Sequence, residues 1–250
     1  MIRIIIVDDE PLARSGIVTR LGRQPDCEVV ASCASAEEAQ MEIQKHAPDL
    51  VFLDIWMTGL SGIELMESLP GRDHPAIILL TAHEQYAVEA FRHEALDYLL
   101  KPVDDERLAE ALNRARRLLA LRERAGTRSD PVEEGIDVIR QGSWMTRFTV
   151  RTRRNVKFVK ARNVDWIEGL GDYVGLHEGQ TTHLVRVPLS FLGERLDPAH
   201  FLRIHRSAIV NVDRILNIAR LVNQDSIVTL ASGQELRASR TYYEALKKRM

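Results

Sequence analysis

The residues best suited to chemistry in this sequence are carboxylates that follow apolar, β-branched runs. Asp8 and Asp9 follow the run Arg3–Val7, and Asp54 ends the run Leu50–Asp54. In a parallel α/β sheet, functional groups gather at the carboxyl ends of the strands. Three carboxylates at one such edge repel one another and need a compensating cation. A hard divalent ion with a preference for oxygen ligands, Mg²⁺ or Mn²⁺, meets that need.

Two further strand ends supply a hydroxyl and an ammonium group. Thr81 ends the run Ala76–Thr81, and Lys101 with Pro102 follows the run Asp97–Leu100. If all these strands are parallel neighbours, the hydroxyl and the ammonium reach the same edge as the carboxylates.

This set of groups is suited to phosphoryl transfer. A carboxylate can attack a phosphoryl group and form an aspartyl phosphate, while a metal ion and an ammonium neutralise charge on the equatorial oxygens. We predict Asp54, which stands alone at its strand end, as the phosphoacceptor. Asp8 and Asp9 are then the metal-side pair, Lys101 supplies the ammonium, and the hydroxyl of Thr81 bonds to a phosphoryl oxygen.

The first 120 residues alternate strand and helix patterns, which predicts βα units and a parallel sheet covered on both faces. The expected strands are Arg3–Val7, Glu28–Cys33, Leu50–Asp54, Ala76–Thr81 and Asp97–Leu100. The expected helices are Pro11–Leu21, Ala36–Lys45, Gly62–Ser68, Gln85–Arg92 and Asp104 to about Leu121.

The second half has a different pattern. Residues 122–137 are polar and contain Gly, Pro and acidic residues, which indicates a linker. Residues 138–250 contain short, closely spaced β-prone stretches, which predicts a mostly antiparallel β domain. Short helices are expected at Leu189–Leu196 and Thr241–Lys248. The predicted domains are therefore 1–121 and 138–250, joined by the linker.

Charge is distributed unevenly between these halves. Residues 1–120 carry 12 Lys and Arg against 21 Asp and Glu, whereas residues 141–250 carry 18 against 10. A basic second half suggests a polyanionic partner, although a solvated basic surface remains an alternative from charge alone. With two cysteines, no secretory signal pattern and no long apolar run, we expect a cytoplasmic protein that does not enter a membrane.

The first half resembles the receiver domain of two-component systems. The matching text is VDDE at 7–10, LDIWMTGLSG at 53–62, LLTA at 79–82 and DYLLKP at 97–102. The resemblance implies a flavodoxin-like strand order 2-1-3-4-5 and phosphorylation of Asp54 by a partner histidine kinase. It also implies that the main-chain carbonyl of Trp56 helps to hold the metal and that the peptide bond before Pro102 is cis.

The same resemblance implies a switch and a dimer. Thr81 and Tyr98 match a pair in which the hydroxyl moves to the phosphate and the ring follows inward. Residues 85–121 match the surface through which phosphorylated receivers form homodimers. One departure stands out: the family often has proline where this chain has Thr58, which leaves the conformation of that loop open.

Residues from about 142 to 248 resemble the LytTR DNA-binding domain. The matching text is VDWIEGLGDYV at 164–174, RVPLSFLGERL at 186–196, FLRIHRSAIVNVDRI at 201–215 and ELRASRTYYEAL at 235–246. The resemblance implies that loops enter successive major grooves of duplex DNA. Arg206 and Arg240 are the candidates for base contacts, since a guanidinium pairs bidentately with guanine. Lys157 is a candidate phosphate contact, and the remaining DNA-facing candidates are Gly169, Leu170, Gly171, Asp172 and Tyr173.

These features favour a phosphorylation-switched transcription factor that binds promoter DNA, and not an enzyme. An acyl-phosphate-forming phosphatase is an alternative, but Trp56 stands where a second aspartate would be needed. A receiver fused to an RNA- or protein-interaction module is another. A comparison of binding to duplex DNA and to RNA separates that alternative from the transcription factor.

Overall fold

The computed structural model describes residues 1–69, 74–82, 95–125, 140–141, 144–151, 156–221, 225–239, 242 and 247. The predicted helix at 85–92, most of the predicted linker and most of the predicted helix at 241–248 lie outside the described residues. The chain divides into two compact units, Met1–Ala120 and Leu121–Met250, and each is described by itself.

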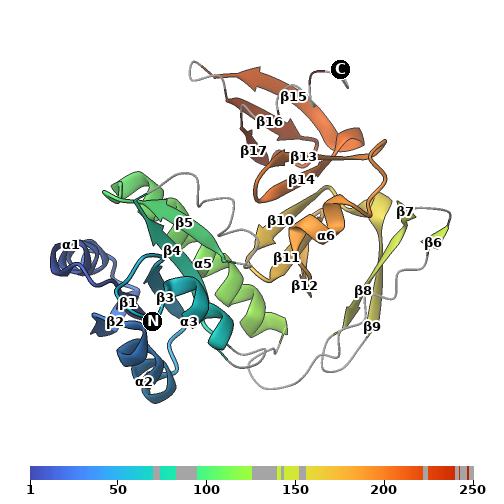
Figure 1. Cartoon of the computed structure of the whole chain (residues 1–250). Coiled ribbons are helices and arrows are strands. Elements are labelled where there is room, and N and C mark those ends of the chain that lie inside the picture. The colour runs from blue at the N-terminus through green and yellow to red at the C-terminus, as the bar shows by residue number, and fades with distance from the viewer. Residues whose placement is uncertain are drawn as a thin grey trace. The chain divides into compact units, whose positions relative to one another are not determined.

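The first unit contains a five-stranded parallel sheet in the order β2-β1-β3-β4-β5 (Figure 1). This confirms the predicted strand order. The strands are β1 (Ile2–Val7), β2 (Cys27–Cys33), β3 (Leu50–Asp54), β4 (Ala76–Thr81) and β5 (Asp97–Leu100). Every residue of β3 and β4 is buried, as expected for central strands of a sheet that is covered on both faces.

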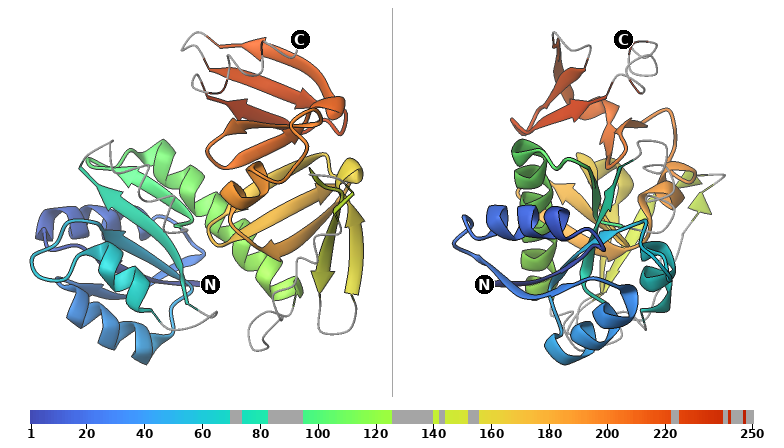
Figure 2. Two further views of the ribbon diagram at one scale, coloured as in Figure 1. Left: turned by 45° about the vertical axis from the view of Figure 1, so that its right-hand side comes forward. Right: turned by 60° about the vertical axis from the view of Figure 1, so that its left-hand side comes forward.

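Helices cover both faces of this sheet. They are α1 (Pro11–Leu21), α2 (Ala36–His46), α3 (Gly62–Ser68) and α5 (Asp105–Ala125). Figure 2 shows α1 and α5 on one face, with α2 and α3 on the other. The final helix continues four residues beyond its predicted end at Leu121.

Local signals in the sequence start these helices. Pro11 occupies the first turn of α1, where its missing N–H costs nothing. Ser61 and Glu64 form a capping box at α3, in which each side chain accepts from the other residue's main-chain N–H. The carboxylate of Asp104 accepts from the main-chain N–H groups of Glu106 and Arg107 at the start of α5.

The second unit is built mostly of antiparallel strands, as predicted. A five-stranded sheet has the order β12-β11-β10-β14-β13, and a three-stranded sheet has the order β15-β16-β17. The strands of these sheets are β10 (Trp166–Leu170), β11 (Tyr173–Glu178), β12 (Thr181–Arg186), β13 (Phe201–His205), β14 (Ala208–Asn211), β15 (Ile215–Arg220), β16 (Ser226–Leu230) and β17 (Glu235–Ala238).

Shorter elements complete the second unit. Two-stranded ribbons pair β6 (Arg140–Gln141) with β7 (Trp144–Met145), and β8 (Arg147–Arg151) with β9 (Val156–Lys160). Single 3₁₀ turns follow β9 at Ala161–Asn163 and β14 at Val212–Arg214. Helix α6 spans Leu189–Gly193 and is three residues shorter than predicted. Glycine has a low helix propensity, and the chain continues beyond Gly193 in a turn in which the main-chain N–H of Leu196 bonds to the carbonyl of Leu192.

Two hydrophobic clusters hold the second unit together. The larger one joins the β8–β9 ribbon, α6 and residues of β10, β11 and β14, and its fully buried members include Phe148, Ile167 and Leu192. The smaller one joins β13 and β14 to the three-stranded sheet through Ile204, Val228 and Leu230. The five-stranded sheet therefore contributes residues to both clusters.

Candidate functional site

Three carboxylates meet at the carboxyl edge of the parallel sheet. Asp8 and Asp9 follow β1, and Asp54 ends β3, the strand paired with β1 in the sheet. One oxygen from each of the three carboxylates lies within 4.8 Å of the other two. Asp8 is fully buried and Asp54 is 4% exposed, while Asp9 is partly exposed. The structure therefore brings together the acidic residues that the sequence singled out.

Lys101 joins two of these carboxylates. Its Nζ lies 2.7 Å from Oδ2 of Asp8 and 2.6 Å from Oδ2 of Asp54. The main-chain N–H of Lys101 donates to the carbonyl of Thr81 at 2.7 Å, which fixes the chain as it leaves β5. The Lys101–Pro102 peptide bond is cis, as the resemblance implied.

Burial and the ammonium group act on the charges of this pocket in opposite ways. Burial raises the pKa of the Asp54 carboxyl above its ordinary value, although the hydrogen bond from Lys101 opposes that rise. Burial lowers the pKa of Lys101, yet its hydrogen bonds to Asp54 and Asp8 bring the net pKa above the ordinary value. Lys101 therefore remains a cation beside both carboxylates.

The loop between β3 and α3 closes tightly on the pocket. The main-chain N–H of Trp56 donates to Oδ1 of Asp54 at 3.2 Å, and the Trp56 side chain is exposed. A side chain at Gly62 would place a Cβ 2.0 Å from the main-chain oxygen of Asp54, so only glycine allows this approach. The same loop contacts Asp9, because the main-chain N–H and the hydroxyl of Thr58 both donate to Oδ2 of Asp9, at 3.1 and 3.0 Å.

Thr81 and Tyr98 lie on neighbouring strands. Thr81 is fully buried at the end of β4, and Tyr98 is half-buried on β5 beside the core cluster that contains Leu53 and Leu79. The role of this pair as a switch remains a prediction.

The donor set of the pocket fits a hard divalent cation. Asp8, Asp9 and Asp54 offer carboxylate oxygens, the ligands that Mg²⁺ and Mn²⁺ prefer. Two of the three carboxylates are buried, so their mutual repulsion is weakly screened by solvent. The acidic cluster can therefore hold a metal ion, with Lys101 already balancing part of the charge.

Two of the candidate DNA-facing segments lie side by side in the second unit. The main-chain N–H of Gly169, on β10, donates to the carbonyl of Ser207 at 2.8 Å. Ser207 follows Arg206 in the turn between β13 and β14. The turn after β10 is tight, with Gly171 at a φ of 72°, a conformation that favours glycine.

Most side chains of the segment 169–173 point into the unit. Leu170 is fully buried, and Asp172 and Tyr173 are 3% and 7% exposed. The carboxylate of Asp172 lies 3.0 Å from Nε of Arg186. Gly171 is the partly exposed residue of this turn.

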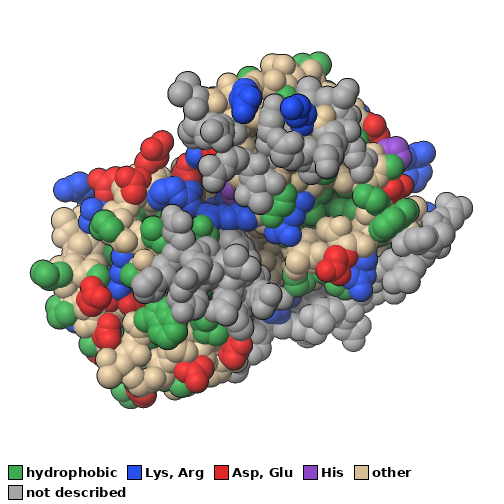
Figure 3. All heavy atoms as spheres, turned by 45° about the horizontal axis from the view of Figure 1, so that its top comes forward, with side chains coloured by type: hydrophobic (Ala, Val, Ile, Leu, Met, Phe, Trp, Pro, Cys, Tyr) green, Lys and Arg blue, Asp and Glu red, His purple; other side chains and the backbone are tan. Residues whose placement is uncertain are grey.

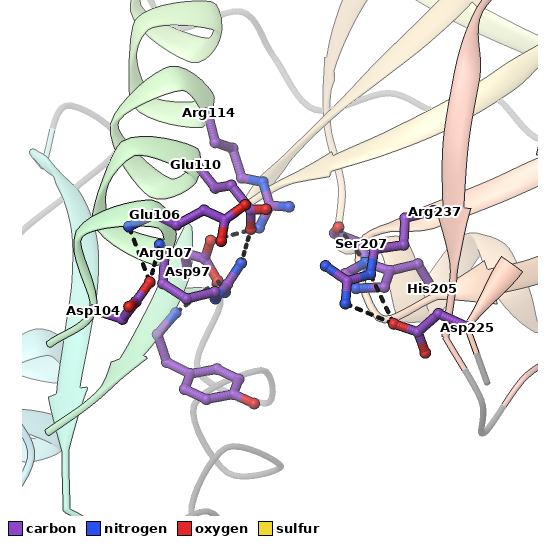
Figure 4. Close-up of polar contacts among 11 residues, drawn as sticks. Asp97, Asp104, Glu106, Arg107, Glu110, Arg114, His205, Ser207, Asp225 and Arg237 are labelled. Atoms are coloured by element: carbon purple, nitrogen blue, oxygen red, sulfur yellow. Dashed lines mark hydrogen bonds and ion pairs between the residues drawn. The ribbon is translucent and has the colours of Figure 1, made fainter. Parts of the chain in front are cut away.

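The turn around Arg206 is braced by its neighbours. Arg206 is half-buried, and Nη2 of Arg203 donates to its carbonyl at 2.5 Å. His205 is half-buried, and its Nδ1 lies 2.9 Å from Oγ of Ser207. Figure 4 shows His205 and Ser207 together, with Arg237 directed at Asp225 from the three-stranded sheet.

The structure describes only one of the two remaining candidates for DNA contact, Lys157 and Arg240. Lys157 is exposed on β9, where its Nζ lies 3.2 Å from Nε2 of His183 and 3.5 Å from Oε2 of Glu178. Arg240 lies outside the described residues. DNA contact by Lys157, Arg206, Arg240 and the segment 169–173 remains a prediction.

Sequence reasoning missed two contacts in the first unit. Asp97 is 1% exposed and faces two arginines of α5, with Arg114 at 2.9 Å and Arg107 at 3.7 Å (Figure 4). The contact between Thr58 and Asp9 was missed as well. Basic residues at 107 and 114 were visible on one helical face, but no sequence signal links Thr58 to a residue 49 positions away.

The surface reflects the uneven charge of the sequence. On the face that Figure 3 shows, acidic side chains in red are more numerous over the first unit than over the second. In the described part of the chain, no helix is both long enough and apolar enough to cross a bilayer.

Comparisons with known proteins agree with this geometry. Residues 4–113 match the response regulator receiver domain, and residues 154–250 match the LytTr DNA-binding domain. The transcriptional regulatory protein BtsR of Escherichia coli (strain K12) is 34% identical over 99% of this chain and 98% of its own length.

Two further relatives span the whole chain. An uncharacterized response regulatory protein of Yersinia pestis is 32% identical over 100% of this chain and 99% of its own length. The sensory transduction protein LytT of Bacillus anthracis is 30% identical over 99% of this chain and 98% of its own length. This chain belongs to the two-component response regulators that join a receiver domain to a LytTR DNA-binding domain, the transcriptional regulators of the LytR/AlgR type.

Proposed function

We propose that Asp54 accepts a phosphoryl group from a partner histidine kinase and that the phosphorylated chain binds promoter DNA as a dimer. The observation that carries this proposal is the position of Asp54 at the end of β3. Its carboxylate lies 2.6 Å from Nζ of Lys101 and beside Asp8 and Asp9. A divalent cation held there by Asp8, Asp9 and Asp54, with the Trp56 carbonyl, would neutralise charge on the phosphoryl oxygens.

The chain's own groups have distinct parts in the transfer. An oxygen of Asp54 forms the new bond to phosphorus, while the bond from phosphorus to the donor histidine nitrogen breaks and the histidine keeps the electron pair. Lys101 leaves its pairing with Asp54 and balances the charge that the phosphoryl oxygens bring. The hydroxyl of Thr81 donates to one of those oxygens.

Phosphorylation then changes the charge of a buried site. It adds about −1.5 to −2 charges and strong hydrogen-bond acceptors. Movement of Thr81 toward the phosphate draws Tyr98 inward and biases the surface of residues 85–121 toward dimerisation. A dimer places two DNA-binding domains on neighbouring sites, and such linkage raises avidity by about 10²–10⁴.

DNA recognition belongs to the second unit. The match to a DNA-binding domain favours duplex DNA over the RNA- or protein-binding alternatives. Arg206 and Arg240 would contact base edges, the turn 169–173 would approach the groove, and Lys157 would contact phosphate. With promoter DNA as its partner, the chain would act in the cytoplasm.

Phosphorylation of the full chain by acetyl phosphate with Mg²⁺ tests this proposal. Intact mass spectrometry should show one added phosphoryl group on the wild type and none on Asp54→Asn. Asp213→Asn changes an exposed aspartate of the second unit and should behave as the wild type. Equal labelling of Asp54→Asn would contradict the assignment of the phosphoacceptor.

A further inference from the structure

The loop between β3 and α3 forms hydrogen bonds to one carboxylate of the acidic pocket. Thr58 donates two hydrogen bonds to a single oxygen of Asp9, one from its main-chain N–H at 3.1 Å and one from its hydroxyl at 3.0 Å. These bonds connect the loop after β3 to the loop after β1. They hold Asp9, a residue of the acidic cluster, against the loop that follows Asp54.

Asp9 needs such a link more than its two partners do. Asp8 and Asp54 are buried at strand ends, and Lys101 lies within 2.7 Å of both. Asp9 lies one residue beyond Asp8 and is partly exposed. Without a cation, repulsion from the other two carboxylates favours rotation of the Asp9 side chain toward solvent. The bonds from Thr58 oppose that rotation and keep the carboxylate of Asp9 in the cluster, where it can contribute an oxygen to a cation.

The loop that carries Thr58 is itself held in place. The main-chain N–H of Gly62 donates to the carbonyl of Ile55 at 3.1 Å, and Ser61 forms the capping box of α3. Because the backbone is fixed at both ends of the loop, the hydroxyl of Thr58 is already directed at Asp9. A hydrogen bond from such an ordered group loses little conformational entropy on forming.

We propose that Thr58 is a positioning residue for the divalent cation: it holds Asp9 in the orientation that binds the metal and so raises metal affinity. This inference rests on the metal site in the proposed function. Proline at this position would remove both donors, since it lacks an N–H and a hydroxyl. Valine would remove the hydroxyl and keep the N–H.

Mn²⁺ binding to the full chain tests the proposal, with the free ion measured by electron paramagnetic resonance. Thr58→Val should bind Mn²⁺ about tenfold more weakly than the wild type, and Thr58→Pro up to about 100-fold more weakly, the range found when groups that orient metal ligands are removed. Thr58→Ser keeps both donors and should bind as the wild type does. Thr19→Val, the same change at a hydroxyl that bonds within α1, is the matched control.

The outcomes separate positioning from other roles. At saturating Mg²⁺, Thr58→Val should accept phosphate from acetyl phosphate at the wild-type rate, because Thr58 acts through Asp9. Mn²⁺ affinity of Thr58→Val equal to or above that of the wild type would overturn the inference, since the hydrogen bonds would then be irrelevant to the metal or compete with it. If Thr58→Pro fails to fold, the comparison of Thr58→Val with Thr58→Ser still tests whether the hydroxyl raises metal affinity.

A different result would contradict the metal site itself. If Asp9→Ala binds Mn²⁺ as tightly as the wild type, the acidic cluster is not the metal site. If Asp9→Ala loses binding while Thr58→Val does not, the site stands and only the role of Thr58 is wrong.

Discussion

The acidic pocket of the first unit and the turn region of the second are built in different ways. In the pocket, Asp54 and Lys101 lie at the ends of strands whose positions are fixed by the ladder of the parallel sheet. In the turn region, the main-chain N–H of Gly169 on β10 donates to the carbonyl of Ser207, and the side chain of Arg203 donates to the carbonyl of Arg206 in the turn between β13 and β14. The pocket thus lies at the carboxyl edge of a parallel sheet, whereas the turn region lies where β10 and the β13–β14 hairpin end in an antiparallel sheet.

This difference predicts different responses to mutation. The backbone of the pocket is buried and closely packed, so that one added side-chain atom must displace it. A small substitution there should therefore have a large effect on stability. Arg206 in the turn region is half-buried, so its substitution removes individual contacts and should have a smaller effect. Substitutions of Gly62 and Arg206, each with matched comparisons, test this contrast, and a surface substitution of Asp26 gives the smallest expected effect.

Substitution of Gly62 should have the largest effect. Gly62→Ala places a Cβ 2.0 Å from the main-chain oxygen of Asp54, so the backbone of the pocket must move. We expect a loss of about 3 kcal/mol in the free energy of unfolding, measured by urea denaturation of the full chain. Phosphorylation by acetyl phosphate should also slow.

Two glycines of the second unit are the controls. At Gly169 a Cβ would lie 3.1 Å from the flexible end of Leu189, and at Gly179 it would have nothing within 4 Å, although the φ of Gly179 is 56°. Gly169→Ala and Gly179→Ala should each cost about 1–2 kcal/mol. If Gly169→Ala costs as much as Gly62→Ala, the two regions are equally rigid and the contrast is wrong.

Substitution of Arg206 should have an intermediate effect on DNA binding. Arg206→Ala should weaken binding of the full chain to its specific site by about 1–3 kcal/mol, and much less to random duplex, because a base contact carries sequence information. The measurement is a mobility-shift titration at several salt concentrations.

Lys157 offers the matched comparison for that titration. Lys157→Ala should weaken binding to specific and random duplexes similarly and should reduce the salt slope by about one, as expected for a phosphate contact. Equal losses on both duplexes for Arg206→Ala would move base recognition elsewhere, most simply to the turn 169–173.

The smallest effect concerns a surface ion pair of the first unit. Arg116 on α5 contacts both oxygens of Asp26 at 2.7 Å, and both side chains are partly exposed. The hydrogen bonds from Arg116 hold the pKa of Asp26 below its ordinary value of 3.8. A carboxyl whose pKa is lower in the folded state contributes stability above its unfolded pKa, and that contribution is lost as the pH falls through the folded value.

Asp26→Asn should therefore lower the free energy of unfolding by about 0.5 kcal/mol at pH 7, since solvent screens this pair. The difference from the wild type should begin to shrink as the pH falls below about 4 and should disappear only below the folded-state pKa of Asp26, which is lower than 3.8. Thermal unfolding between pH 7 and pH 3 measures both values. A difference that grows toward low pH would show that the sign of this coupling is wrong.

The strands of the first unit could be read from the sequence because their signals are local. The predicted bounds of β3, β4 and β5 agree with the structure. Their continuous apolar runs are typical of central parallel strands, and Pro11 and Ser61 mark helix starts. Once the strand ends were placed, the parallel topology brought Asp8, Asp54 and Lys101 together.

Less of the structure of the second unit could be predicted from its sequence. Its antiparallel class followed from the alternation of apolar and polar residues, but the burial of Leu170 and Asp172 did not, because it depends on side chains from distant strands such as Arg186. The length of α6 was also overestimated, since the end of a short helix depends on local packing.

The sequence by itself determined the two-part organisation, the classes of both folds and the acidic residues at the strand ends. These follow from the periodicity of apolar residues and from the rule that parallel strands share a carboxyl edge. Only the tertiary structure decided that Thr58 contacts Asp9 and that Asp97 faces Arg114. Such contacts join residues that are distant in the chain. The distance between two such side chains, and the direction in which each one points, are set only when the helices and strands pack and fix the backbone.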